Sequence, residues 1–66
     1  MSHHTSVRVL ATVVVYLDNK VVIPAREDEG SSVGNIVLNA RAANCAAYGP
    51  SVDVRLSNIR EVPTFR

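Results

Sequence analysis

The sequence predicts an α+β domain in which two strands, one helix and a third strand follow one another along the chain. This prediction rests on a long β-branched run near the N-terminus, an alanine-rich segment with helical spacing, and a short alternating segment after it. We expect a three-stranded, mainly antiparallel sheet in the order 2-1-3, with the helix packed on one face. In the alternative topology, the third strand lies parallel to the second one after a right-handed crossover.

Length, charge and cysteine content narrow the class of protein. The chain has 66 residues, close to the lower size limit for a stable core, so we expect a single domain over 1–66 with flexible tails at 1–6 and 64–66. The formal net charge is +1, with seven basic and six acidic residues. This near balance argues against general binding to a phosphate backbone. The single cysteine, Cys45, excludes an internal disulfide and favours a cytoplasmic location. We expect neither a signal peptide nor a membrane span.

The central strand is expected over 7–17, where no Gly or Pro interrupts the chain. Every second residue from Val7 to Leu17 is apolar. The other face is mixed and carries Arg8, Leu10, Thr12, Val14 and Tyr16. Such a strand suits the middle of a small sheet, with the helix on its apolar face and a partly exposed surface behind it.

A turn at Asp18-Asn19 leads into the second strand. A two-residue loop would place Leu17 opposite Lys20, whereas a three-residue loop would place Leu17 opposite Val21. We favour the three-residue loop because it gathers the apolar residues of both strands on one face. Pro24 lacks an N–H donor, which marks the second strand as an edge strand.

The segment 26–30, which reads Arg-Glu-Asp-Glu-Gly, is expected to form an acidic turn before the helix. Ser31 or Ser32 can then cap a helix from about Ser32 to Ala47. Its predicted apolar stripe consists of Val33, Ile36, Val37, Ala40, Ala43 and Ala47. Gly49 and Pro50 should end the helix.

The third strand is expected to start at about Ser51, because Val52, Val54 and Leu56 alternate with polar residues. The alternation changes phase at Ser57-Asn58, which predicts a bulge or bend there. Pro63 is expected to end the strand.

Catalytic and metal-binding patterns are not recognisable in this sequence, so we expect no enzyme activity, no metal site and no cofactor. Cys45 lies among alanines, which favours a small structural cysteine over a nucleophile. His3 and His4 are adjacent in the expected tail and have too few candidate co-ligands. The carboxylates at 27–29 lack the spaced oxygens of a calcium loop.

Several segments together resemble a family of very small bacteriophage proteins, best known from the gene-two product of podoviruses, which inhibits bacterial RNA polymerase. The matching segments are Ala11-Thr12-Val13, Val22 to Glu27, the helix from Ser32 to Ala47, and Val52 to Leu56. The resemblance implies a ββαβ fold and a host protein as the partner. The third-strand arginines with which that family grips the polymerase would correspond to Arg55 and Arg60, although this chain lacks the family's tight arginine pair.

We therefore expect a protein-binding module that acts as a phage-encoded inhibitor of a host enzyme, such as RNA polymerase, in the bacterial cytoplasm. Its surface is either the uncovered sheet face or the free edge of the third strand. The candidate partner-binding residues are Arg55, Arg60, Arg26, Glu27, Asp28 and Tyr16. One alternative is a nucleic-acid-binding domain that uses arginines on the sheet face; another is a self-associating structural protein. A monomer or a weak homodimer is expected.

Overall fold

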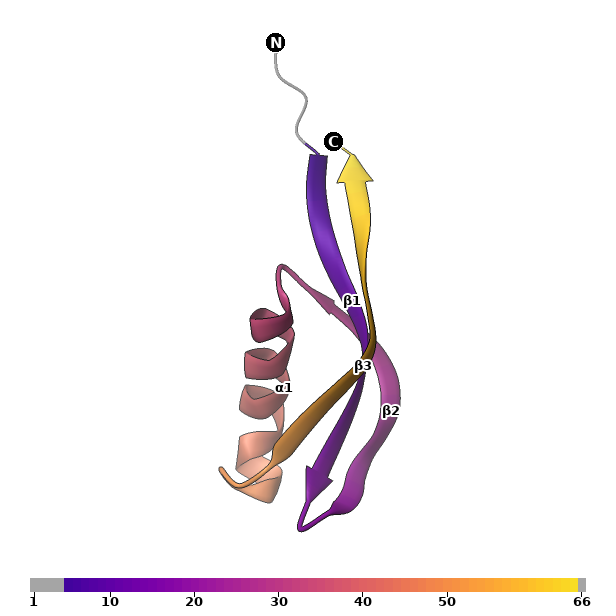
Figure 1. Ribbon diagram of the computed structural model, residues 1–66. Helices are drawn as coiled ribbons and strands as arrows, with labels where there is room; N and C mark the ends of the chain where they lie inside the picture. Colours follow the sequence, from indigo (N-terminus) through magenta and orange to yellow (C-terminus); the bar gives the residue numbers. More distant parts are fainter. Residues whose placement is uncertain (1–4, 66) are drawn as a thin grey trace.

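The predicted order of strands and helix is present in the computed structural model, which describes residues 5–65 (Figure 1). The elements are β1 (Thr5–Leu17), β2 (Lys20–Gly30), α1 (Val33–Tyr48) and β3 (Asp53–Phe65). β1 lies in the middle of the sheet and pairs antiparallel with β2 on one side and β3 on the other. The α+β fold and the strand order 2-1-3 are therefore confirmed.

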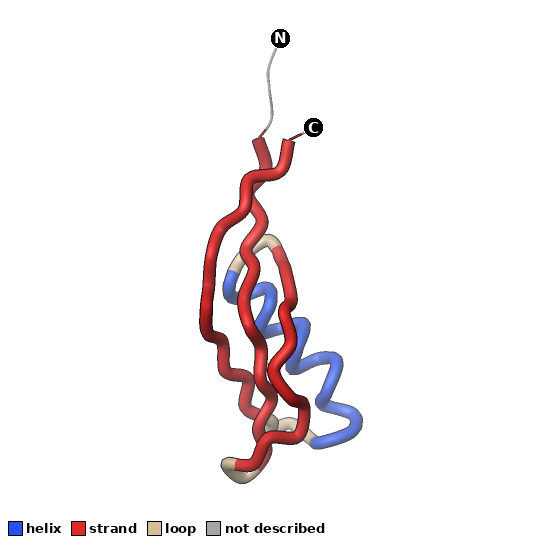
Figure 2. The backbone as a smooth tube through the Cα atoms, turned by 90° about the vertical axis from the view of Figure 1, so that its right-hand side faces the viewer, coloured by secondary structure: helices blue, strands red, loops and turns tan. Residues whose placement is uncertain are grey.

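The core lies between β1 and α1, on one face of the sheet. Its buried residues are Val9, Ala11, Val13, Val15, Ile36, Ala40 and Val52. The four that belong to β1 occupy alternate positions, as the period of a strand requires. Figure 2 shows the three strands side by side, with the helix behind them on one face only.

The sheet is longer than the helix that covers it. β1 has 13 residues, which span about 43 Å. α1 has 16 residues, which span about 24 Å. β1 and β3 therefore continue past β2 and α1 as a two-stranded ribbon, in which Thr5 pairs with Phe65 (Figure 1).

The hairpin between β1 and β2 differs from the favoured prediction. Asp18 and Asn19 have φ values of 52° and 63°, and Leu17 lies opposite Lys20. The three-residue loop is wrong, because two consecutive left-handed residues form the two-residue turn that matches the twist of a hairpin. Val22 is then an extra residue in β2 and shifts the register by one position. Ile23 therefore lies opposite Val15, the same pairing that the three-residue loop predicted.

A second register shift, at Pro24-Ala25, places Arg26 opposite Val13. From there β2 pairs regularly with β1 as far as Gly30, which lies opposite Val9. The acidic segment 26–30 is therefore part of a strand and not a turn, because β1 extends far enough to pair with it. Pro24 lies in an edge strand, as predicted.

The helix has the expected ends. The Asn35 backbone N–H donates to Ser32 Oγ at 3.0 Å, and the Ser31 N–H donates to Asn35 Oδ1 at 3.2 Å. Gly49, with φ 87°, ends the helix, and its N–H donates to the Cys45 carbonyl at 2.7 Å.

The predicted apolar stripe of the helix is buried only in part. Ile36 and Ala40 are buried, and Val37 is half-buried, whereas Val33, Ala43 and Ala47 are exposed. Cys45 is also exposed and is not a core residue. The reason is that a single helix on a narrow sheet contacts it along one line of residues, so the flanks of the helix stay open.

β3 contains the predicted irregularity. Thr12 lies opposite Ser57 and Leu10 opposite Arg60, so β3 has one extra residue here, and Asn58 has a φ of 51°. The strand continues beyond Pro63, contrary to the prediction, because proline is tolerated in an edge strand. Residues 1–4, which include His3 and His4, and Arg66 lie outside the described residues.

Candidate functional site

The sheet face opposite α1, called the outer face here, carries most of the predicted site. Its central row consists of Arg8, Leu10, Thr12, Val14 and Tyr16 of β1. The last four of these are half-buried although no helix lies over them. Side chains from β2 and β3 lean over this row, and they determine what a partner would meet.

The bulge in β3 brings two arginines to the outer face. Arg55 and Arg60 are five positions apart, so in a regular strand they would point to opposite faces. The extra residue at Asn58 changes the parity, and the pairing then places Arg55 opposite Val14 and Arg60 opposite Leu10. A local irregularity of the backbone thus aligns both basic groups.

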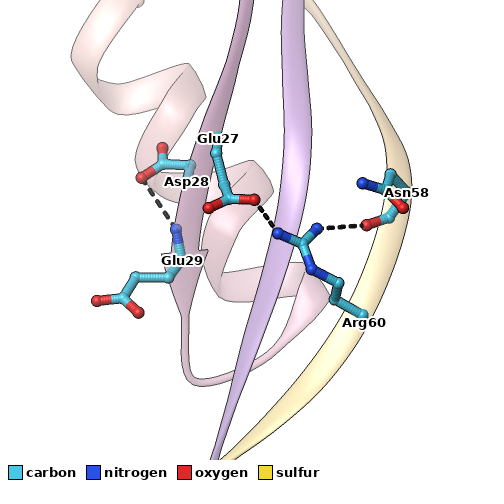
Figure 3. A network of polar contacts seen from close by, with 5 residues as sticks. All are labelled: Glu27, Asp28, Glu29, Asn58 and Arg60. Carbon is cyan, nitrogen blue, oxygen red and sulfur yellow. Dashed lines mark hydrogen bonds and ion pairs between the residues drawn. The ribbon is translucent and has the colours of Figure 1, made fainter.

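Arg60 reaches across the central strand. Its guanidinium forms an ion pair with the Glu27 carboxylate on β2, and Nη1 donates to the Asn58 carbonyl at 3.0 Å. Figure 3 shows the side chain passing from β3 over β1 to Glu27. The ion pair therefore links both edge strands above β1.

Arg55 is held by three neighbours. Its Nε donates to Asp53 Oδ2 at 3.0 Å, and its guanidinium carbon lies 4.0 Å from the centroid of the Tyr16 ring. Nη2 also lies 3.4 Å from Asn19 Oδ1 in the hairpin turn. The guanidinium is thus fixed against the aromatic ring before any partner binds.

A third pair completes the charge pattern: Arg8 Nη2 lies 3.7 Å from Glu29 Oε1. Each arginine on the outer face within the described part of the chain, namely Arg8, Arg55 and Arg60, is thus matched by one carboxylate. These exposed pairs contribute little stability, typically below about 1 kcal/mol each. The pairs instead orient the arginine side chains, which lie across the sheet beside carboxylates and do not form an open basic patch.

Two of the predicted site residues are elsewhere. Arg26 and Asp28 lie opposite Val13 and Ala11, on the side of β2 that faces the helix. They line a groove of about 260 Å³ between β2 and α1. Because segment 26–30 is a strand, its consecutive side chains alternate between the two faces of the sheet. Glu27 therefore lies on the outer face, whereas Arg26 and Asp28 lie on the face that carries the helix.

The structure therefore brings together Tyr16 with Arg55, and Glu27 with Arg60, on one surface. Two residues that hold Arg55, namely Asp53 and Asn19, are not among those predicted from the sequence. Asp53 could have been found from its two-residue spacing to Arg55, which places both on the same face of a strand. The role of Asn19 depends on the pairing of β1 with β3 and has no local signal.

Comparisons with protein-family models, with curated proteins and with solved structures found no match to this chain. Among the described residues, no helix is long and apolar enough to cross a membrane. No three His, Cys, Asp or Glu residues of this part of the chain are grouped so that they could hold a metal ion.

Proposed function

We propose that this protein is a small, non-enzymatic protein-binding module that docks on its partner through the outer face. The row of Leu10, Val14 and Tyr16, which no helix covers, supplies apolar area, and Arg55 and Arg60 of the neighbouring strand β3 supply hydrogen-bond donors. Arg and Tyr are enriched in protein interfaces, and they often supply most of the binding energy.

The observation that carries this proposal is the stacking of Arg55 on Tyr16, with Asp53 fixing the guanidinium. Side chains that are ordered before binding lose less conformational entropy when a partner arrives. The pair thus has the properties of a preformed anchor. The ion pair between Arg60 and Glu27 orders the part of the same face around Leu10 and Thr12 in a similar way.

For the partner, we propose a large host enzyme such as bacterial RNA polymerase, with this chain acting as a phage-encoded inhibitor in the host cytoplasm. The support is the resemblance of segments Val22 to Glu27 and Val52 to Leu56 to that phage family. The shared outward direction of Arg55 and Arg60 adds to it, because one flat surface could engage both groups.

A nucleic acid fits this face less well. Arg8, Arg55 and Arg60 each have a carboxylate partner, so a phosphate backbone would meet the carboxylates as well as the guanidinium groups. Counterion release, which drives phosphate binding, needs a surplus of basic groups. Among residues 5–65, the outer face has no such surplus.

Binding of the immobilised protein to purified bacterial RNA polymerase, and to bacterial lysate with identification by mass spectrometry, tests the proposal. We expect Tyr16→Ala and Arg60→Gln each to weaken binding about tenfold, the loss of one good anchor contact. Arg26→Gln is the matched control, because it removes the same charge from the other side of the sheet.

Unchanged binding of both outer-face variants would overturn the assignment of the surface. Failure to retain any bacterial protein, together with a salt-dependent shift of labelled DNA or RNA, would favour the nucleic-acid alternative.

A further inference from the structure

β3 is an open edge of the sheet. Its only neighbouring strand among residues 5–65 is β1, so the peptide groups that point away from β1 have no strand partner in that range. β2, the other edge, is interrupted by Pro24 and by two register shifts. In contrast, β3 pairs without interruption from Asp53 to Ser57, so it can accept another strand more readily.

An apolar groove lies between α1 and the segment that leads into β3. It has a volume of about 330 Å³ and is lined by Leu38, Arg41, Ala42, Cys45, Pro50 and Val52. Leu38 is 68% exposed, the highest value for any large hydrophobic residue in the described part of the chain. Arg41 is the only charged residue in α1. This flank of the helix is therefore unusually apolar for a surface in contact with water.

A strand that is added to β3 would place every second side chain on the helix side of the sheet. Val54 and Leu56 of β3 have this direction, because they lie opposite Val15 and Val13. The added strand therefore needs apolar side chains on its helix side, where the groove is open. On the outer face, it needs charges that complement Asp53 and Arg55.

β3 of a second copy meets both requirements. If two β3 strands pair antiparallel with Val54 opposite the partner's Val54, then Asp53 lies opposite the partner's Arg55. Symmetry repeats this contact, so each Asp53 carboxylate, which already binds Arg55 of its own chain, also faces the guanidinium of the partner's Arg55 on the outer face. In the same register, the partner's Leu56 lies opposite Val52, which lines the groove.

We propose that this protein forms a homodimer in which two β3 strands pair antiparallel about a two-fold axis at Val54. The result is a six-stranded sheet with both helices on one side. The two outer faces lie on the opposite side and stay uncovered, so a dimer would present the proposed docking face twice. The dimer goes beyond the proposed function and does not depend on it.

Sedimentation equilibrium of the full chain and of charge-reversed variants tests this register. Asp53→Arg and Arg55→Asp each place like charges opposite one another, and each should weaken self-association by about tenfold or more. An equimolar mixture of the two variants again places opposite charges in both contacts across the two-fold axis. We therefore expect the mixture to form a heterodimer about as stable as the unmodified dimer.

Two further variants separate this interface from other effects. Ala42→Glu introduces a charge into the groove at an exposed helix position, so it should give a folded monomer, with folding checked by circular dichroism. Arg26→Asp reverses a charge on the other edge strand and should leave the dimer unchanged. A sample of the unmodified chain that is monomeric at about 1 mM would overturn the proposal. The proposal would also be overturned if Asp53→Arg and Arg55→Asp each dimerised as tightly as the unmodified chain.

Discussion

The guanidinium carbon of Arg55 lies 4.0 Å from the centroid of the Tyr16 ring, so a residue of β3 stacks on a residue of β1. The strand register explains this contact, because Tyr16 lies opposite Asp53 and Arg55 is the next residue of β3 on the same face. Asp53 then holds the guanidinium over the ring. The main anchor of the outer face is thus a product of strand pairing.

A double-mutant cycle with Tyr16→Leu and Arg55→Met should reveal this contact. We expect a coupling of about 0.5–1 kcal/mol in the free energy of unfolding, as is usual for an exposed cation–π pair. Urea unfolding at concentrations where the chain is monomeric provides the measurement. In the control cycle, Tyr48→Leu replaces Tyr16→Leu and should be additive with Arg55→Met; equal coupling in both cycles would contradict the interpretation.

Replacement of Val13 by Asp should unfold the domain. Val13 is 3% exposed, between β1 and α1, where a carboxylate would be shielded from water, and Arg26, opposite it on β2, is itself exposed to solvent. Such a change costs several kcal/mol, which is comparable to the whole stability of a domain of this size. Val21→Asp makes the same change at a residue that is 53% exposed, and it should stay folded. Circular dichroism distinguishes the two, and a cooperative thermal transition in Val13→Asp would contradict the assigned core.

Two glycines should respond in opposite ways to alanine. A Cβ at Gly30 would lie 2.5 Å from Asn35 Oδ1 and 2.9 Å from Ile36 Cγ1, so these side chains or the β2 backbone would have to shift. We expect Gly30→Ala to lower the free energy of unfolding by about 1–3 kcal/mol. At Gly34, the nearest atom is Ser32 Oγ at 3.9 Å, and the site is helical. Gly34→Ala should therefore raise stability by about 0.5–1 kcal/mol.

Urea unfolding measures both glycine variants. If Gly30→Ala were as stable as the unmodified chain, the close approach of β2 to the first turn of α1 would be wrong.

The left-handed residue in the β3 bulge is a further test, because it controls where Arg60 points. Asn58 has a φ of 51°, which a β-branched side chain adopts only at a cost of about 1–2 kcal/mol. Asn58→Val should therefore be less stable than Asn58→Gly by roughly that amount. Thermal unfolding compares the two variants, and equal stability would argue against a left-handed residue here.

Several features of the fold follow from local sequence alone. The alternation in β1 identified its buried face, Ser32 and Gly49 marked the two ends of the helix, and the change of phase at Ser57-Asn58 located the bulge. These signals depend on the period of one element or on the backbone preference of one residue. For this reason, they could be read without knowledge of neighbouring strands.

The composition of the candidate site depended on tertiary structure. Segment 26–30 looks like a turn in the sequence, but it pairs with β1, and this pairing separates Glu27 from Arg26 and Asp28. The bridge from Arg60 to Glu27 likewise requires a register across three strands. A shift of one residue moves a side chain to the opposite face of a sheet, and such shifts are set by turns and bulges acting together. The sequence alone therefore determined the order of the elements and their central strand, whereas strand pairing decided how far the strands extend and which charged residues share the outer face.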